Sequence, residues 1–545
     1  MLSKGRPRSL LPVTGMSIGL FSSSEPDEAV TQTGPIFSLP LELFVRIIKF
    51  ASQYDPTLEP PRRDTASREA DAVRRLGWIC VTHVCSSWRR IVLETPTLWW
   101  EISPRLGPTW METILARSKG APVDLMLQRE EVKSAVRIAS LHLSHARSIF
   151  FGPGVPDEQD AWLMELPAPI LKTYECYGIS SHQPNLFANH APLLRRLVIH
   201  NVWDYPWTQQ PFRTLVHLTV DGSKDPPSAE EFFNVLQGTP ALEHLALARC
   251  LPENFKFLAY NLLVELPHLK TLRLDGDVSS VAECMARFHI NPSTHLDLRC
   301  FSEDARRREY ARIFPVILAH LSRAGSSAPP LRHLMLEVEI RCFVRFLVTR
   351  DLPAEVRGID FFFLDRTPDI RVEFCWLYGT QDAEAALALP DMIFNALPLA
   401  NVEMFSFLAF QRLWPKAFWV NIMRKFPRIK YLGSSERALF RALFYSNEEL
   451  NEWEGLDAQF GHDDGLLFPC LETFIIEHDI LWSLFDSGEI SSAGLVELLE
   501  RRRLASPLRT VFVSDLFKCN MEDESWSEQL AKTLEEYFNN KPPLP

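Results

Sequence analysis

The residues that could hold a metal ion or attack a substrate lie singly along the 545-residue chain. Its ten cysteines are scattered, and the closest pair, Cys80 and Cys85, lacks the C-x-x-C spacing that structural zinc sites favour. His462 stands beside Asp463 and Asp464 and could help to hold a cation, but the flanking glycines make a solvated loop the better interpretation. We therefore predict no metal site and no bound cofactor.

The sequence also lacks the local motifs that position catalytic or phosphate-binding groups. It contains no G-x-x-x-x-G-K-[ST] loop, no G-x-S-x-G nucleophile turn and no H-E-x-x-H pair. The Gly-Pro-Gly at 152–154 lacks the third glycine of a dinucleotide site. The neighbours Glu243 and His244, and likewise Glu477 and His478, are typical of polar residues on a surface. We predict no catalytic residue and no enzymatic activity.

The charge balance limits the class of partner. The chain has 57 basic and 69 acidic residues, a formal net charge of −12. Binding to nucleic acid needs a basic face that neutralises phosphates, so we predict no nucleic-acid partner. Arg501, Arg502 and Arg503 form a notable basic run, which we interpret as the solvated face of a helix.

The sequence shows no clear signal for secretion or membrane insertion. The single N-x-[ST] string, at 291–293, contains a proline and cannot be glycosylated. The most apolar stretch, Leu387 to Leu399, is interrupted by Pro390, Asp391 and Asn395, so no run reaches the roughly 18 residues of a membrane helix. We expect reduced cysteines, no membrane partner and a cytoplasmic or nuclear location.

The elements that would position any functional residues begin after an N-terminal arm, residues 1–35, that we expect to be disordered. Apolar residues then recur at i, +3, +4, +7, +8 and +11, which predicts one helix with one apolar stripe and a proline in its first position. Residues 52–73 are expected to form a long loop. A second helical stretch opens near Arg74, bends near 86–87 and stops before Pro96. The stripe of the first helix is Pro40, Leu43, Phe44, Ile47, Ile48 and Ala51.

The order of short motifs in this region resembles an F-box, and looks most like the large families of fungal F-box proteins. The matching segments are Leu-Pro-Leu-Glu-Leu at 39–43, Ile-Ile at 47–48, Val-Cys-Ser-Ser-Trp-Arg at 84–89 and Thr-Pro-Thr-Leu-Trp at 95–99. The resemblance covers residues 36–102. The loop at 52–73 is longer than the usual connection of an F-box.

The resemblance to an F-box implies a three-helix module that docks on the Skp-type adaptor of a cullin-RING ubiquitin ligase. The alternative is that Ile47, Val84 and Trp88 form only the internal core of the module. By position in the motif, the docking residues would be Leu39, Pro40, Leu43, Ile47, Ile48, Val84, Cys85 and Trp88.

A degenerate repeat fills residues 103–545, in which a small residue or proline precedes the pattern L-x-x-L-x-L. The first leucines of successive copies are separated by 23, 21, 27 and 27 residues between Leu171 and Leu269. These gaps fall in the 20–29 window of leucine-rich repeats. Further copies begin near 331, 471 and 508, weaker ones near 293, 356, 402 and 429, and two earlier strands are expected at 124–127 and 148–151.

Each copy of the repeat predicts a strand, with helices between strands. Alternation with period two places both leucines of L-x-L on the core side of the strand. Residues 229–236 and 255–266 are expected to be helices. We predict an α/β fold, with a small three-helix F-box module followed by a leucine-rich-repeat-like solenoid that breaks around 365–400. A flat α/β domain of different topology is the structural alternative.

These features favour a substrate-recognition subunit of an SCF-type (Skp-cullin-F-box) ubiquitin ligase. The module at 36–102 would dock on the Skp-type adaptor and cullin core, and the repeats would bind an unknown protein substrate. The alternative is a stand-alone leucine-rich-repeat scaffold without ligase recruitment. Aromatic clusters at 203–207 and 414–419 are interpreted as packing, with target binding as their alternative.

Overall fold

The computed structural model of the chain describes most of the region between residues 39 and 514. The predicted arm, most of the 52–73 loop, the repeat copy near 356, the 203–207 cluster and the 462–464 segment lie outside the described residues. The described residues are 39–54, 76–127, 132–152, 165–177, 186–200, 213–222, 226–255, 262–301, 307–323, 330–339, 342–352, 368–376, 383–409, 414, 416–444, 468–477, 484, 487–488, 491–505 and 508–514.

Helices are interspersed among the strands of the described chain. The α-helices are α1 (Leu41–Tyr54), α3 (Ser86–Glu94), α4 (Pro108–Ser118), α5 (Val132–Ser140), α7 (Ala229–Gln237), α8 (Val278–Arg287), α9 (Arg307–Tyr310), α10 (Ile313–Arg323), α11 (Ala383–Ala396), α12 (Lys416–Met423), α13 (Arg437–Phe444) and α16 (Ser492–Ala505). Short 3₁₀ helices are η2 (Gly77–His83), η3 (Pro96–Leu98), η4 (Pro104–Leu106), η5 (Leu143–His145), η6 (Leu186–Asn189) and η8 (Leu399–Asn401).

The strands form one long sheet and one small one. The long sheet has the spatial order β1 (Glu101–Ile102), β2 (Val123–Leu127), β3 (Ala146–Phe151), β4 (Thr173–Tyr177), β5 (Arg196–His200), β6 (His217–Asp221), β7 (His244–Ala248), β9 (Thr271–Asp277), β11 (His295–Phe301), β14 (Ile370–Cys375), β13 (Phe343–Thr349), β12 (His333–Glu339), β15 (Met404–Ala409), β16 (Tyr431–Ser434), β17 (Thr473–Glu477) and β18 (Thr510–Ser514). The small sheet pairs β8 (Val264–Leu266) with β10 (Phe288–Ile290).

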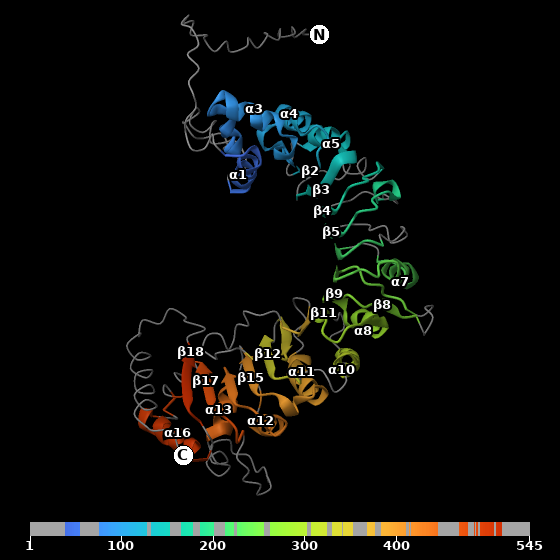
Figure 1. Cartoon of the computed structure of the whole chain (residues 1–545). Helices are drawn as coiled ribbons and strands as arrows, with labels where there is room; N and C mark the ends of the chain where they lie inside the picture. The colour runs from blue at the N-terminus through green and yellow to red at the C-terminus, as the bar shows by residue number, and fades with distance from the viewer. Residues whose placement is uncertain are drawn as a thin grey trace, which may run out of the picture.

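The long sheet is parallel except around β13. Figure 1 shows its strands side by side along an arc, with α7, α8 and α10–α13 on the outer side of the arc and the strands on the inner side. The α/β prediction is therefore confirmed in its general form, as a mixed fold built on a large, mostly parallel sheet.

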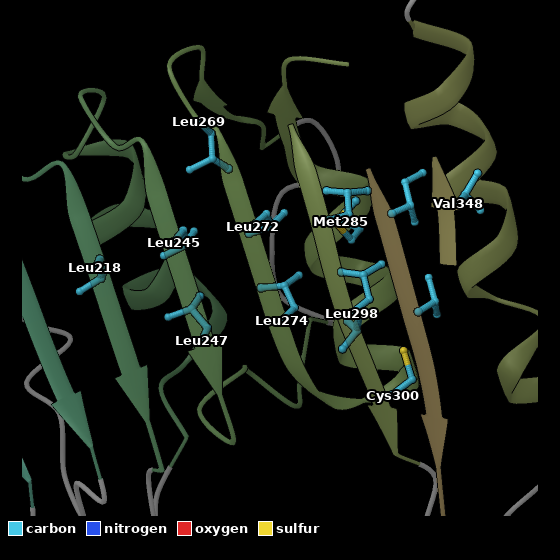
Figure 2. Packing of buried hydrophobic residues seen from close by; sticks show 14 of the residues in the cluster. Leu218, Leu245, Leu247, Leu269, Leu272, Leu274, Met285, Leu298, Cys300 and Val348 are labelled. Atoms are coloured by element: carbon cyan, nitrogen blue, oxygen red, sulfur yellow. The ribbon is translucent and has the colours of Figure 1, made fainter. Parts of the chain in front are cut away.

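The leucines of the repeat hold this sheet together. Leu218, Leu245 and Leu272 occupy the same register on β6, β7 and β9, and each is buried (Figure 2). Leu247 and Leu274 form the next row of the same ladder. Burying one such side chain contributes about 1.5–3 kcal/mol, so the ladder supplies a continuous core between neighbouring strands.

Helix α7 shows how the outer layer covers the leucines. Ser228 and Glu231 form a capping box at its start, which satisfies backbone N–H groups that have no partner within the helix. Phe232 and Phe233 are fully buried in the same hydrophobic cluster as Leu245. The predicted helix at 229–236 and the inward direction of the L-x-L leucines are therefore confirmed.

Strand β13 runs opposite to its neighbours because β12 and β13 form a hairpin, which was not predicted. Only residues 340–342 separate β12 from β13, whereas a parallel crossover needs a dozen or more residues. Strand β13 therefore pairs antiparallel with both β12 and β14. The interruption at β12–β14 begins before the predicted break at 365–400 and overlaps it only in β14.

Two local predictions are wrong. The predicted helix at 255–266 is wrong at its end, where Val264–Leu266 form β8 and pair with β10, whereas residues 256–261 lie outside the described residues. Arg502 was expected on a solvated face, but it is buried, and its Nη2 donates to the Phe468 carbonyl oxygen (2.9 Å). Burial lowers the pKa of Arg502 to about 10. A neighbouring loop covers this turn of α16, which composition alone does not reveal.

The N-terminal helices join the sheet through buried tryptophans. The Trp99 indole is fully buried, donates to the Val92 carbonyl oxygen (2.9 Å) and packs 5.1 Å from the ring of Trp78. Two residues later the chain enters β1, which pairs with β2. No helix among the described residues is long and apolar enough to cross a membrane.

Candidate functional site

Helix α1 has two apolar faces where the sequence predicted one stripe. Phe44 and Ile48 are 5% and 3% exposed and belong to the main hydrophobic cluster. Leu43 and Ile47, one position earlier in each turn, are 47% and 50% exposed. Neighbouring residues on a helix point about 100° apart, so the predicted stripe divides along its length into a core half and a surface half.

The exposed half extends beyond the predicted stripe. Phe50 and Tyr54 are 60% and 75% exposed, and their ring centroids lie 4.9 Å apart. With Leu43 and Ile47 they follow a spacing of i, +4, +7 and +11, which is one face of a helix. The predicted helix ends at Ala51, so Phe50 lies within it but outside the predicted stripe, whereas Tyr54 falls in the predicted loop. We call Leu43, Ile47, Phe50 and Tyr54 the α1 stripe.

The start of α1 is fixed by Pro40, although not in the predicted position. The Pro40 carbonyl oxygen accepts hydrogen bonds from the amides of Leu43 (3.0 Å) and Phe44 (3.1 Å), so this proline precedes the first helical residue. Glu42 lies in the first turn, where a carboxylate interacts favourably with the helix dipole. Leu39 is partly buried and Pro40 is exposed.

The second half of the resemblance motif serves mainly internal structure. Cys85 has extended backbone angles and ends the run from η2, and its Sγ accepts the amide of Trp88 (3.5 Å) at the start of α3. The Trp88 ring packs edge-on against Phe44 at 5.0 Å. Val84, in contrast, is 60% exposed. The predicted bend at 86–87 lies one to two residues earlier, at Cys85.

The eight residues implied by the F-box resemblance therefore occupy three environments. Ile48 is in the core, so it is not available to a partner, and Trp88 contributes to the same core. Apart from Ile48, all the predicted residues are either exposed or partly buried. Those that are exposed are Pro40, Leu43, Ile47 and Val84, and those that are partly buried are Leu39, Cys85 and Trp88.

Exposed apolar bulk is concentrated in this region. Ten large apolar side chains among the described residues are highly exposed, and six of these lie between residues 41 and 84. Contiguous exposed apolar surface marks interaction sites in soluble proteins. The six are Leu41, Leu43, Ile47, Phe50, Tyr54 and Val84, and the other four are Leu141, Leu166, Leu193 and Leu263.

A second surface is made by the strand residues that alternate with the buried leucines. We call this surface the open face of the sheet. Its charged residues form ion pairs between neighbouring strands: Arg196 Nη2 lies 3.8 Å from Glu175 Oε2, and Arg249 Nη2 lies 2.8 Å from Asp221 Oδ1. Pairs of this kind neutralise one another and leave little net charge on the face.

The densest ionic cluster on the open face lies where the sheet turns antiparallel. Arg345 pairs with Glu337 and lies 3.4 Å from Glu373, which also accepts from Arg371 at 3.0 Å. Burial alone would raise the pKa of Glu373, but hydrogen bonds from Arg371 and Cys375 outweigh it and lower that pKa. The cluster links β12, β13 and β14 through side chains as well as backbone.

Four of the described cysteines are buried, four are partly buried and Cys470 is exposed. Burial raises the pKa values of the Cys284 and Cys300 thiols, and it raises the pKa of Cys375 to about 12. A thiol, unlike a thiolate, is a poor nucleophile and a poor metal ligand. Within the described part of the chain, no three His, Cys, Asp or Glu side chains are grouped so that they could hold a metal ion.

No protein-family model matches this chain, and no curated protein matches it. The F-box resemblance therefore depends on the quoted residues alone.

Proposed function

We propose that the chain is a substrate-recognition subunit of an SCF-type ubiquitin ligase, in which an F-box-like module binds the Skp-type adaptor and a leucine-rich-repeat-like sheet region binds a protein target. The observation that supports this most is the α1 stripe, because it exposes a helical row of Leu43, Ile47, Phe50 and Tyr54 within the region that resembles an F-box. An amphipathic helix of this kind suits a helix-in-groove contact.

In this role the chain performs no covalent chemistry. It holds the target near the ubiquitin donor and so raises the effective concentration of the target's lysines there. Buried leucines occupy the same register on the neighbouring strands β6, β7 and β9, which supports a repeat-like origin of the sheet region. Function in the cytoplasm or nucleus is part of the same proposal.

The test compares neighbouring faces of α1. Leu43→Asp with Ile47→Asp places two charges on the stripe and should weaken binding to a purified Skp-type adaptor by at least about 100-fold, since each lost apolar contact is worth about 1.5–3 kcal/mol. Lys49→Asp, on the polar side of the same helix, is the matched control and should change affinity far less. Calorimetric titration gives the affinity and a thermal melt checks the fold.

The outcome separates the two functions under consideration. Loss of adaptor binding by the stripe variant, with an unchanged melt, supports the ligase subunit. If the parent chain does not bind the adaptor at all, the stand-alone repeat scaffold becomes the better description. If the stripe variant binds like the parent, the adaptor contact lies elsewhere on the chain.

A further inference from the structure

The open face carries aromatic rings on β3 to β5 and small side chains on β7, with Asp221 of β6 and its ion-pair partner Arg249 between them. The rings of Phe150 and Tyr177 lie 5.9 Å apart, and the Tyr177 and His200 rings stack at 4.4 Å with an interplanar angle of 21°. Ala246 and Ala248 occupy the open-face positions of β7. All five side chains are partly exposed. We call these five residues the aromatic strip.

The sheet register places strip residues of β4, β5 and β7 in one row with Asp221 of β6. Tyr177, His200, Asp221 and Ala248 are paired in sequence across β4, β5, β6 and β7. Strands in a sheet are about 4.8 Å apart, so the strip spans a width suited to several residues of an extended segment. The short methyl groups of β7 lie two strands from His200, beyond Asp221 of β6.

The charged groups around the strip are already paired with one another. Glu175 has Arg196 as its partner, and Asp221 has Arg249, with His200 Nδ1 lying 3.6 Å from Asp221 Oδ2. A strongly acidic or basic ligand would have to break these pairs before it gained any of its own. The charge pattern therefore complements an uncharged group.

We infer that the aromatic strip is the target-contact site, and that it takes an extended protein segment carrying an uncharged aromatic side chain. The incoming ring would stack beside Tyr177 and His200, and a neighbouring residue of the segment would lie over the methyl groups of Ala246 and Ala248, beyond the ion pair of Asp221 and Arg249. Aromatic pairs contribute stabilisation beyond the area they bury, and Tyr, Trp and Arg are enriched among the residues that dominate protein interfaces. This inference rests on the proposed function, because it assigns the target class of the same subunit.

The test uses a phage-displayed library of random twelve-residue peptides selected on the full chain. Selected peptides should carry Trp, Tyr or Phe and have a net charge near zero. Ala248→Arg should weaken their binding at least tenfold, because the longer charged side chain covers the strip. Ala116→Arg is the matched control: it makes the same change at an exposed position of α4, in the helical layer, and should alter binding less than twofold.

Tyr177 provides a second pair of variants that does not depend on Ala248. Tyr177→Ala should weaken peptide binding about tenfold, whereas Tyr177→Phe keeps the ring and should retain binding. The inference is overturned if selected peptides are strongly acidic or basic, if no peptide is enriched over bare support, or if Ala248→Arg and Tyr177→Ala both bind like the parent. Leu43→Asp with Ile47→Asp should leave peptide binding intact, so failure of adaptor docking and failure of the strip give different results.

Discussion

The two halves of the sheet differ in what they do with the face opposite the helices. In β6 and β7 buried and partly exposed residues alternate, so one face meets the core and the other meets solvent. In β12 and β15 nearly every residue is buried. A second hydrophobic cluster accounts for this in the later half, and consists of Met335, Met404, Leu408 and Ile475.

The difference shows that hydrophobic alternation along a strand indicates how many of its faces are covered. A strand covered on one side alternates, whereas a strand covered on both sides becomes a continuous apolar run. The Leu-x-Leu copies around β7 are therefore regular, and the copy around β15, Met-Phe-Ser-Phe-Leu-Ala, looks degenerate. The weaker repeat signal of the later half reflects burial on both faces.

The largest expected effect is in the later half, at two adjacent isoleucines. Ile475 and Ile476 are both fully buried, on opposite faces of β17. Ile475→Asp and Ile476→Asp should each lower the free energy of unfolding by several kcal/mol, because each buries an unpaired charge. Urea denaturation measures both. A mild effect at Ile475 would show that the second cluster is open to solvent.

The matching pair in the earlier half should behave unequally. Leu245→Asp should cost several kcal/mol and unfold a marginal chain, since domains are typically stable by only about 5–15 kcal/mol. Ala246→Asp, one residue later on the open face, should change the free energy of unfolding by about 0.5 kcal/mol or less. Thermal melts of the two variants give the comparison. Equal destabilisation would mean that the open face of β7 is covered.

A smaller effect concerns a histidine at the start of β12. Burial lowers the pKa of His333 to about 4, below its unfolded value near 6.5. The folded state therefore holds the neutral form, and its stability is complete above pH 6.5 and is lost as the pH falls toward 4, because the unfolded chain binds the proton more tightly. His333→Gln should remove about 3 kcal/mol of that acid-dependent loss, as followed by denaturation at pH 7 and pH 4. An unchanged pH dependence would contradict the assignment.

The smallest expected effect contrasts this histidine with one in the earlier half. The pKa of His217 is lowered to about 4 by burial first, and then by the nearby positive charges of Arg196 and His244. The Debye length falls from about 10 Å at 0.1 M salt to about 3 Å at 1 M. The pKa of His217 should therefore rise by a few tenths in high salt, while that of His333 stays constant. NMR titration of the ring protons at both salt concentrations measures the difference.

The parts of the fold that could be predicted from the sequence are those set by local pattern. The leucines of β6, β7 and β9 were found because period-two alternation and constant spacing are visible along the chain. Strand β8 was missed because it has three residues, too few for period-two alternation to be visible along the chain. The β12–β13 hairpin was also missed, because its three-residue connection lies inside a degenerate copy of the repeat.

The candidate docking site was predictable as a region but not residue by residue. Leu43 and Phe44 look alike in an apolar stripe, and only the position of Trp88 decides that Phe44 is the one buried. The role of Cys85 as a helix cap likewise appears only once η2 and α3 are seen to end and begin beside it. Side chains that look equivalent in the sequence pattern therefore differ in burial, because their tertiary neighbours differ.

Strand β1 determines what the first edge of this long sheet offers to another chain. An exposed edge strand offers unpaired N–H and C=O groups to any other chain, and proteins protect such edges with very short strands. The sheet begins with the two residues Glu101 and Ile102, held in place by the tryptophans that precede them. A chain cut after Ile102 would present the five-residue β2, with its apolar core face, as a new edge. Removing the N-terminal helices would therefore give the sheet an unprotected edge that favours aggregation.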